Sequence, residues 1–452
     1  MKEPRRLLSS TALAACLLLM TLLYATYFAS IDILFEPWKH PTTDWRGNSS
    51  REKVDKGSDS QRSWLRRLVR GDDRARLEAE GFSCHNGLHA DVCVANKPVR
   101  IDTKAMKIYI PSDSNKSLER IVKPYARKED DMQNVTPVKM LKGNINPPAC
   151  DFTHNVTAVI FSSGGFAGNL FHEFNEIIIP LFITCRHFQS RLKFIITDYS
   201  AQWVQKYNPI LTQISPYAAI DPEADGKVHC FPGAIVGLQF HDNLVLNSTD
   251  IPGGYSMTDF KHFLMETYNL KIRHVSEVEK PVLMLISRQN SRRFLNEDEM
   301  VKLMEKLGFQ VLVIPPGRMS KLKKFARVVN SCSVLVGAHG AGMANELFLP
   351  TGAVVIQAVP LGLEWASTAY FGEPAGGMGL RYLEYKIEPE ESSLINTYGR
   401  DHPVITDVGS IIAKGYQAFR AVYVDGQDLK INLTRFRETL IEAMQILGLS
   451  AP

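Results

Sequence analysis

Short apolar runs alternate with amphipathic segments through the second half of the chain. Short apolar runs bounded by polar or glycine positions predict buried strands, and apolar residues spaced three and four apart predict helices. Strands are expected at Val282–Ser287, Gln310–Ile314, Val334–Val336 and Ala353–Gln357. Helices are expected between them at Asn296–Leu307, Ser320–Asn330 and Gly342–Leu347. This alternation is typical of a doubly wound α/β sheet.

The first half contains one strand–helix–strand unit. A strand at Ala158–Phe161 leads through a glycine-rich turn into a helix from Leu170 to about Phe188, and a second strand follows at Leu192–Thr197. Such a unit predicts parallel pairing of its strands. Two units of this kind in one chain predict an α/β protein with two Rossmann-like domains and a ligand between them, at the carboxyl ends of the strands.

The N-terminal residues have a different pattern. Leu7–Ala29 contains no charged side chain, and a helix of this length spans about 34 Å, enough to cross a bilayer. Lys2, Arg5 and Arg6 precede it, so we expect a cytosolic tail at residues 1–6 and a single-pass type II signal anchor at residues 7–29. A cleaved signal peptide is the alternative, and the length of the apolar run disfavours it.

Polar and charged side chains dominate the stretch after the apolar run. Residues 30–80 contain few aliphatic side chains, and such a sequence buries too little apolar surface to fold, so we expect a flexible stem. The remainder is expected to form an N-terminal Rossmann-like domain (81–270), a C-terminal Rossmann-like domain (271–400) and a C-terminal helical segment (401–452).

Composition excludes one class of partner and favours one compartment. The chain is 45% apolar but carries a net charge of only +4, which argues against a nucleic acid partner. Six N-x-S/T sequons suit a secretory protein and predict glycosylation. They lie at Asn48, Asn115, Asn134, Asn155, Asn247 and Asn432.

The cysteines fit the same compartment. Six of the seven follow the apolar N-terminal run, and an even number is compatible with disulfides. Cys84 and Cys93 are the expected local pair because both lie in a loop-like segment. A zinc site is the alternative, but no C-x2-C pair supports it.

Several ligand-binding motifs are missing. No G-x-G-x-x-G occurs at a strand–helix junction, and neither G-x4-G-K-[ST] nor Asp-x-Asp occurs at all. The first two absences argue against an NAD-dependent oxidoreductase and a P-loop NTPase. The third removes a common pattern for holding a divalent ion on a nucleotide diphosphate, so no metal site and no cofactor is predicted.

The strongest candidate site is "VGAHGAGMANE", where a strand meets a helix. His339 lies among three glycines, and the first amides of a helix attract anions. His339, Gly340, Ala341 and Gly342 are therefore predicted to bind a phosphate. A plain tight turn is the alternative, which one glycine would satisfy.

A second candidate is "LISRQNSRR", at the end of a predicted strand. Ser287 and Arg288 stand at the strand tip, with Arg292 and Arg293 just beyond. Guanidinium groups pair bidentately with phosphate oxygens, so a strand-end loop of this kind suits an anion. A solvated basic loop is the alternative.

A third candidate is "HEFNE", which follows the glycine turn of the first half. His172 and Glu176 are four residues apart, on one helix face. A carboxylate fixes the tautomer of a histidine and raises its basicity, so the pair is a candidate general base, with either member taking the proton. A zincin-like H-E-x-x-H is disfavoured because Glu176 replaces the second histidine. A structural polar pair is the other alternative.

An aromatic stretch follows the last predicted core strand. Glu364, Trp365 and Tyr370 lie in "PLGLEWASTAYFGEP". Sugars present apolar C–H faces and hydroxyl groups, which suit aromatic rings flanked by carboxylates. These residues are therefore candidates for binding an acceptor sugar, and packing in the core is the alternative.

Four blocks, in order along residues 80–445, resemble glycosyltransferase family 61, in particular the plant enzymes that decorate xylan. They are "GNLFHEFNEIIIPLF", "ISRQNSRRFLNE", "VGAHGAGMANELFLPTGAVVIQ" and "PLGLEWASTAYFGEPAGGMGLRYLEY". The resemblance implies the GT-B fold, with the N-terminal domain binding the acceptor and the C-terminal domain the nucleotide sugar. It also implies an inverting, metal-independent enzyme of the Golgi membrane.

The resemblance further implies the substrates. Related plant enzymes transfer arabinofuranosyl or xylosyl units from UDP-sugars to xylan, so a UDP-pentose donor and a xylan acceptor are expected. The family pattern H-x3-D falls on His172 and Glu176, with Glu in place of the usual Asp. Arg288, His339 and the amides at Gly340–Gly342 would then stabilise the leaving diphosphate. A catalytically weak scaffold protein that binds glycans or nucleotide sugars is the alternative.

Overall fold

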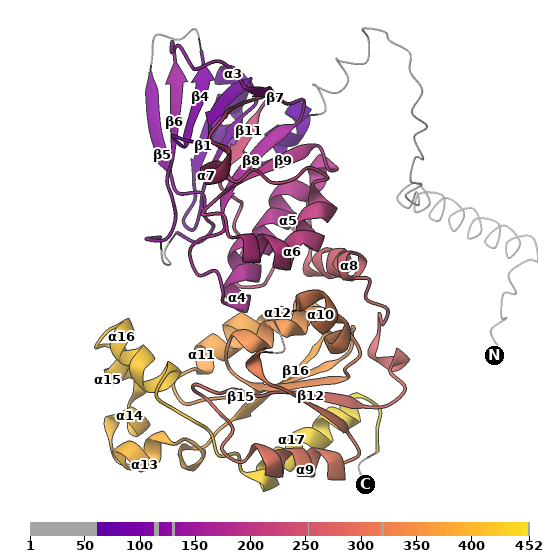
Figure 1. The fold of residues 1–452 in the computed structure, drawn as a ribbon. Coiled ribbons are helices and arrows are strands. Elements are labelled where there is room, and N and C mark those ends of the chain that lie inside the picture. The colour runs from indigo at the N-terminus through magenta and orange to yellow at the C-terminus, as the bar shows by residue number, and fades with distance from the viewer. Residues whose placement is uncertain (1–60, 113–116, 129–131, 252, 318–320, 451–452) are drawn as a thin grey trace, which may run out of the picture. The chain divides into compact units, whose positions relative to one another are not determined.

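The strands form three sheets in the part of the chain that the computed structural model describes, residues 61–450 without 113–116, 129–131, 252 and 318–320 (Figure 1). Two mixed sheets lie within residues 82–236, and a parallel sheet lies within residues 282–386. All described residues belong to one compact unit, residues 55–452.

The first sheet has the strand order β1–β2–β11–β8–β9. The strands are β1 (Phe82–Asn86), β2 (Asp91–Ala95), β8 (Thr157–Ser162), β9 (Leu192–Thr197) and β11 (Ala234–Val236). β8, β9 and β11 run parallel, in agreement with the strand–helix–strand pattern. β1 and β2 instead form an antiparallel hairpin, in which Cys84 lies opposite Cys93 and forms a disulfide with it.

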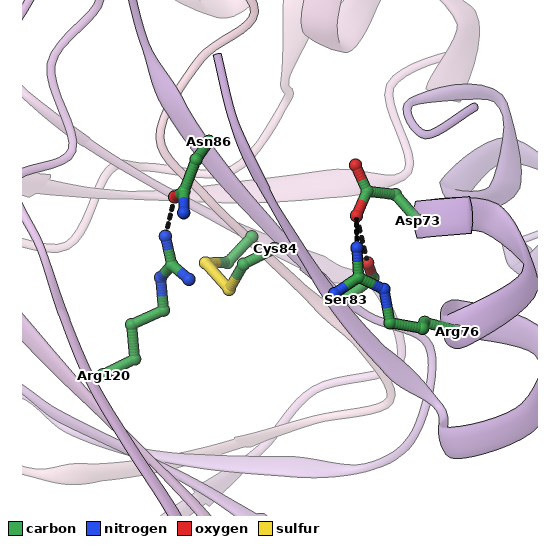
Figure 2. The surroundings of a disulfide bond; sticks show 7 residues. Asp73, Arg76, Ser83, Cys84, Asn86 and Arg120 are labelled. Carbon is green, nitrogen blue, oxygen red and sulfur yellow. Dashed lines mark hydrogen bonds and ion pairs between the residues drawn. A yellow bond between two sulfur atoms is a disulfide. The ribbon is translucent and has the colours of Figure 1, made fainter. Parts of the chain in front are cut away.

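Figure 2 shows polar contacts on both sides of this disulfide. Asp73 of helix α3 (Gly71–Glu80) accepts hydrogen bonds from Arg76 Nη2 at 2.6 Å and from Ser83 Oγ at 3.3 Å. At the other end of β1, Arg120 donates to the Asn86 side chain. The hairpin is therefore joined to α3 on one side and to a strand of the second sheet on the other.

The second sheet has the order β5–β6–β4–β3–β10–β7. Its strands are β3 (Val99–Asp102), β4 (Lys107–Pro111), β5 (Leu118–Val122), β6 (Val138–Gly143), β7 (Phe152–Thr153) and β10 (Val228–Phe231). A second disulfide joins Cys150 to Cys230, 80 residues apart.

Strand β8 shows how the layers are built. Val159 and Phe161 belong to a core shared with the helices, whereas Ala158 and Ile160 belong to a core shared with the second sheet. Successive strand residues point to opposite faces, so the first sheet has helices on one face and another sheet on the other.

This arrangement corrects the prediction of two facing Rossmann-like domains of the GT-B type. A Rossmann-like sheet is parallel and has helices on both faces. Here the antiparallel hairpin β1–β2 extends the sheet, and six further strands cover one of its faces. The protein has a mixed α/β fold in which only the third sheet has the expected form.

The third sheet is parallel, with the order β13–β12–β14–β15–β16. The strands are β12 (Val282–Ile286), β13 (Gln310–Ile314), β14 (Val334–Ala338), β15 (Val354–Val359) and β16 (Arg381–Lys386). Alternate residues of β12 face opposite cores, one shared with α9 (Glu297–Lys306) and α17 (Leu433–Ile446), the other with α10 (Leu322–Asn330) and α12 (Glu373–Gly377). Figure 1 shows these two helix pairs on opposite faces of the sheet.

The helix expected from Leu170 to about Phe188 is composite. It comprises α4 (Leu170–His172), a π-helix η1 (Glu173–Ile178), α5 (Ile179–Cys185) and a 3-10 turn η2 (Arg186–Phe188). Pro180 explains the break, because it lacks the amide that an α-helix would direct to the Glu176 carbonyl. A π-helical turn absorbs the mismatch.

The remaining helices fill the connections. They are α6 (Ala201–Ile214), α7 (Pro222–Asp225), α8 (Met257–Tyr268), η3 (Val275–Glu277), η5 (Ala341–Phe348), α11 (Glu364–Ser367), η6 (Thr368–Gly372), η7 (Pro389–Glu391), α13 (Leu394–Tyr398), α14 (Pro403–Thr406), α15 (Val408–Ile412), α16 (Tyr416–Phe419) and η8 (Arg420–Val424). The helices between residues 394 and 424 pack on a small core of their own around Tyr423.

Two expectations for the N-terminal part are corrected. None of the described helices is long and apolar enough to cross a bilayer, so the structure does not support a type II protein of the Golgi membrane. The expected span at residues 7–29 lies outside the described residues. Residues 61–80, expected in the stem, are largely helical and place Leu65 and Leu77 in the core.

Candidate active site

A cavity of about 950 Å³, here called the site cavity, lies beyond the carboxyl ends of β12 and β14. Three parts of the chain line it. The segment between β5 and β6 contributes Arg127, and the connection after β8 contributes Phe166, Asn169, Phe171 and His172. The third sheet contributes Arg292, His339, Gly340, Ala341, Trp365 and Tyr370, and the C-terminal helices contribute Ile412, Tyr416, Phe419 and Arg420.

His172 and Glu176 form a dyad at one side of the cavity. His172 Nδ1 lies 2.5 Å from Glu176 Oε1, across the junction of α4 and η1. The His172 side chain is 22% exposed and lines the cavity, whereas Glu176 is fully buried behind it. In a neutral imidazole, an Nδ1–H that donates to the carboxylate leaves the lone pair on Nε2. Of the two proposed bases, only His172 is therefore placed to touch a ligand.

Two further side chains hold Glu176. Tyr125 donates its hydroxyl hydrogen bond to Glu176 Oε2, and Arg127 Nη1 lies 3.7 Å from Oε1. Tyr125 is also in contact with the glycine turn, where a Cβ on Gly165 would lie 2.4 Å from its ring. Gly165 has φ +62°, a conformation that favours glycine. The turn before α4 is therefore shaped to fit the residues that hold the dyad.

Aromatic rings surround the dyad. Phe166 stacks on His172 with ring centroids 4.5 Å apart, and Phe171 stacks on Tyr370 at 5.1 Å. Trp365 meets Tyr370 edge to face at 5.7 Å, and the Arg127 guanidinium lies over the Tyr370 ring at 5.9 Å. Tyr370 thus contacts both Phe171, which neighbours His172, and the exposed Trp365.

His339 is held in the opposite tautomer. Its Nδ1 accepts from Gln357 Nε2 at 3.0 Å and from Ser367 Oγ at 3.1 Å. Tyr382 donates to Gln357 Oε1 at 2.7 Å, which fixes the orientation of that amide. Burial and two neighbouring arginines, Arg292 and Arg288, lower the pKa of His339 to about 3. His339 is therefore neutral at physiological pH, with Nε2–H as its donor.

Two arginines make this end of the cavity cationic. Arg292 is buried, and its Nη1 donates to the His339 carbonyl at 2.9 Å. Burial, Arg288 and Arg420 lower the pKa of Arg292 to about 9, against the opposing effect of Asp425. Both arginines remain charged at neutral pH, and Arg292 Nε is buried without a hydrogen-bond partner among the described residues. An anion would relieve the cost of burying these charges.

Gly340 brings the backbone close to these arginines. A Cβ there would lie 2.4 Å from Arg288 Nη1, and Gly340 has φ +148°. It precedes η5, whose first amides, at Ala341 and Gly342, have no intrahelical acceptor. Amides at such a position favour negative charge.

The other two glycines of the motif have a packing role. A Cβ on Gly337 would lie 2.7 Å from Met343 Sδ, and a Cβ on Gly342 would lie 2.9 Å from Ile286 Cγ2. Both glycines therefore let η5 lie close to β12. Gly340 and Gly342 were both predicted to bind the phosphate, but only Gly340 lines the cavity.

Several predicted site residues lie away from the cavity wall. Ser287 Oγ donates to Glu297 at 3.1 Å, Arg288 Nε donates to the Ser291 carbonyl at 2.8 Å, and Glu364 is exposed and accepts from the Gly362 amide at 3.2 Å. The Arg288 guanidinium lies against Gly340, which separates it from the cavity. Arg293 is paired with Asp428 at 2.6 Å on the surface.

The predicted glycosylation sites fall into two groups. Asn134, Asn155, Asn247 and Asn432 are exposed. Asn48 and Asn115 lie outside the described residues.

Sequence reasoning missed part of the wall. Arg127 comes from an irregular segment after β5, and its backbone has a positive φ of +69°. Ile412, Tyr416, Phe419 and Arg420 come from the C-terminal helices. No local motif marks these residues, since only tertiary packing brings them to the cavity.

The arrangement has two chemical ends. A histidine backed by a buried carboxylate can take a proton from a hydroxyl group. Facing the same cavity, two buried cationic or donor side chains and free helix amides can stabilise developing negative charge. Such a site can transfer a group from an anionic leaving group to a hydroxyl acceptor.

Comparison with known proteins identifies the group. Residues 152–356 match the family described as Glycosyltransferase 61. The chain is 36% identical to a xylan glycosyltransferase of Arabidopsis thaliana, MUCI21, over 80% of this chain and 79% of that protein. It is 39% identical to the alpha-1,3-arabinosyltransferase XAT3 of Oryza sativa subsp. japonica, over 80% and 65% of the two chains. It is 38% identical to the rice beta-1,2-xylosyltransferase XYXT1, over 72% of each chain.

The fold, the site and these similarities define the class: the chain is a glycosyltransferase. It belongs to glycosyltransferase family 61. The family predicted from the four sequence blocks is thereby confirmed.

Proposed function

We propose that the chain transfers a pentosyl unit, arabinofuranosyl or xylosyl, from a UDP-sugar to xylan with inversion at the anomeric carbon. The names of the plant relatives supply the acceptor and the two candidate sugars. The observation that carries the proposal is the site cavity itself, which unites His172 on one side with Arg292, His339 and Gly340 on the other.

In the proposed reaction, His172 Nε2 takes the proton from an acceptor hydroxyl while Glu176 holds Nδ1–H. The acceptor oxygen attacks the anomeric carbon from the side opposite the diphosphate. The bond between that carbon and the diphosphate oxygen breaks, and its electron pair leaves with UDP. A single displacement of this kind inverts the configuration.

The leaving diphosphate needs stabilisation, because its charge increases as the bond breaks. Arg292, His339 Nε2–H and the amide of Ala341 would supply it without a metal ion. Arg288 adds its charge from behind Gly340. We therefore propose UDP-sugar as the donor and no cofactor.

A binding protein without catalysis is the competing function. It was suggested by Glu176 in place of the family's usual Asp. The geometry favours catalysis, because Glu176 reaches His172 at 2.5 Å and is itself held by Tyr125.

The test is incubation of the protein with a panel of UDP-sugars and xylo-oligosaccharides, with product mass and UDP release measured. We expect a mass increase of one pentose with a single preferred UDP-pentose, and anomeric inversion by NMR. Binding of UDP without turnover on any combination would overturn the proposal in favour of the binding protein.

A further inference from the structure

The C-terminal helices form a wall of the site cavity that belongs to neither predicted domain. Residues of α15, α16 and η8 line the cavity, although the sequence analysis predicted no substrate-binding residue beyond Tyr370. Ile412, Tyr416 and Phe419 define this wall.

Large apolar side chains are exposed at this part of the cavity. Ile412 is 52% exposed and Tyr416 is 65% exposed, and Trp365, also lining the cavity, is 71% exposed. Apolar groups of this size that face water around a cavity usually mark a binding surface. Ile412, Tyr416 and Trp365 therefore form an apolar rim of the cavity. The inner end of the same cavity, at Arg292 and His339, is cationic.

Charge separates the two ends. Arg292 and His339 are only 8% and 7% exposed, so an anion must reach the inner end to meet them. Of the charged residues that line this part of the cavity, Arg420 and Asp425 are paired with each other, because Arg420 Nε donates to Asp425 Oδ2 at 2.9 Å. The rim therefore suits an uncharged ligand that extends into solvent.

The wall is held in place. Tyr423, at the centre of its small core, is fully buried and donates to the Val404 carbonyl at 2.8 Å. Gly362, just before Trp365, packs against the Tyr423 ring, and Gln427 Nε2 donates to both the Leu361 and the Tyr423 carbonyls, at 2.9 and 2.7 Å. Side chains fixed before binding cost little entropy when the ligand arrives.

The cavity is also large for a single ligand. Its volume of about 950 Å³ is at the upper end of the range for sites that enclose one drug-sized molecule. A nucleotide sugar whose diphosphate occupies the cationic end leaves the rim to the second substrate.

We propose that Ile412 and Tyr416, together with Trp365 of the same cavity, form a subsite for a neutral β-linked pentose chain, and bind units of the acceptor beyond the one that reacts. The apolar faces of the sugar rings lie on these side chains while the hydroxyl groups face water. This subsite rests on the proposed function, since it names where the acceptor chain runs. It makes the C-terminal segment the part of the molecule that favours longer acceptors.

The test uses the full chain with Tyr416→Ala and Ile412→Ser, alone and together. Tyr217→Ala and Ile446→Ser are matched controls, because both residues are exposed and neither lines the cavity. Initial rates are measured with xylobiose and xylohexaose as acceptors, and donor KM is measured separately. Thermal melting checks that all variants fold.

We expect the KM for xylohexaose to rise about tenfold in the double variant, which is the scale of losing one or two ring contacts. The KM for xylobiose, kcat and the donor KM should change less than about twofold, and the controls should behave as the parent protein. A rise in donor KM alone would overturn the inference and place the nucleobase on this wall. Unchanged kinetics with both acceptors would also overturn it.

A separate measurement distinguishes failure of the proposed function from failure of the proposed subsite. If the parent protein transfers no sugar, binding of xylohexaose is measured directly by calorimetry. Loss of that binding in Tyr416→Ala, but not in Tyr217→Ala, would support the subsite while the proposed reaction fails. Absence of binding by the parent protein would overturn both.

Discussion

The two histidines of the site cavity are held in opposite tautomers. His172 donates through Nδ1 to Glu176, whereas His339 accepts at Nδ1 from Gln357 and Ser367. The first histidine therefore presents a lone pair and the second presents an N–H. The lone pair of His172 can accept a proton, and the N–H of His339 can donate a hydrogen bond to an anion.

The dyad yields the first prediction. His172→Ala should lower kcat by about 100-fold or more, the usual contribution of a general base. Glu176→Gln should also lower kcat, because the amide no longer holds Nδ1–H as a carboxylate does, and Glu176→Asp should retain more activity than Glu176→Gln. Steady-state rates of UDP release at fixed, saturating donor measure the effect.

Glu364→Gln is the control for the dyad variants. Glu364 is exposed and lies off the cavity wall, so its variant should keep kcat within about twofold of the parent protein. Parental kcat in Glu176→Gln would show that the carboxylate has no part in the reaction.

Glu346 yields a prediction about stability. It is fully buried, and neither carboxylate oxygen has a hydrogen-bond partner among the described residues. Burial raises its pKa well above the usual value, against the opposing effect of Lys261. The folded state thus keeps a proton that the unfolded state releases above about pH 4.5, and folding is penalised increasingly as the pH rises.

Glu346→Gln should therefore stabilise the protein at pH 7.5, and the gain should vanish near pH 4.5. Denaturant unfolding at several pH values measures it. Glu391→Gln is the matched control, since Glu391 is buried but accepts from Tyr385, the Asn432 amide and Arg435. The free energy of unfolding of that variant should be lower than that of the parent protein by about 1–3 kcal/mol. A Glu346→Gln variant that is less stable than the parent protein at pH 7.5 would refute the argument.

Strand β14 and helix η5 show how one element combines packing with a site. Gly342 lies against Ile286 of β12, whereas Gly340 lies against the arginines. The same short glycine motif thus sets the distance between helix and sheet at one position and the approach to a ligand at another.

Gly340→Ala and Gly342→Ala should separate these two roles. Gly340→Ala places a methyl group 2.4 Å from Arg288 Nη1, so it should raise the donor KM several-fold. Gly342→Ala places one 2.9 Å from Ile286, so it should lower the free energy of unfolding by about 1–3 kcal/mol through overpacking. Donor titrations and denaturant unfolding of both variants check the contrast. Equal effects of the two variants on donor KM would contradict it.

At the scale of elements, the sequence predicted six of the sixteen described strands, namely β8, β9 and β12–β15, and missed the others. β9 and β13 have the predicted bounds, and β12 and β15 differ by one or two residues at an end. Their apolar runs are bounded by polar or glycine residues, which is a local signal. The break in the predicted helix at 170–188 was missed, although Pro180 within it could have indicated it.

In the described part of the chain, two disulfides close loops of different length within residues 84–230. Cys84–Cys93 closes a separation of 9 residues within one hairpin, and Cys150–Cys230 closes a separation of 80. Closing a longer loop removes more entropy from the unfolded chain, about 4.5 kcal/mol against about 2.6 kcal/mol on the loop-entropy scale.

Replacing both cysteines of one bridge by serine tests this difference. The variant without Cys150 and Cys230 should melt at a lower temperature than the variant without Cys84 and Cys93. Calorimetric melting of the two variants, with the parent protein before and after reduction, measures the order. The reverse order would show that local packing around the hairpin outweighs loop entropy.

The sequence by itself predicted the parallel sheet of the second half, the family, the pairing of His172 with Glu176, and the glycine motif at His339 that lines the cavity. These follow from local signals, namely apolar periodicity, glycine turns and residues spaced one helical turn apart. Tertiary structure alone decided that a second sheet covers the first, that Glu176 is buried behind His172, and that Arg127 and Tyr416 reach the same cavity. These features depend on contacts between residues far apart in the chain, and no local pattern encodes them.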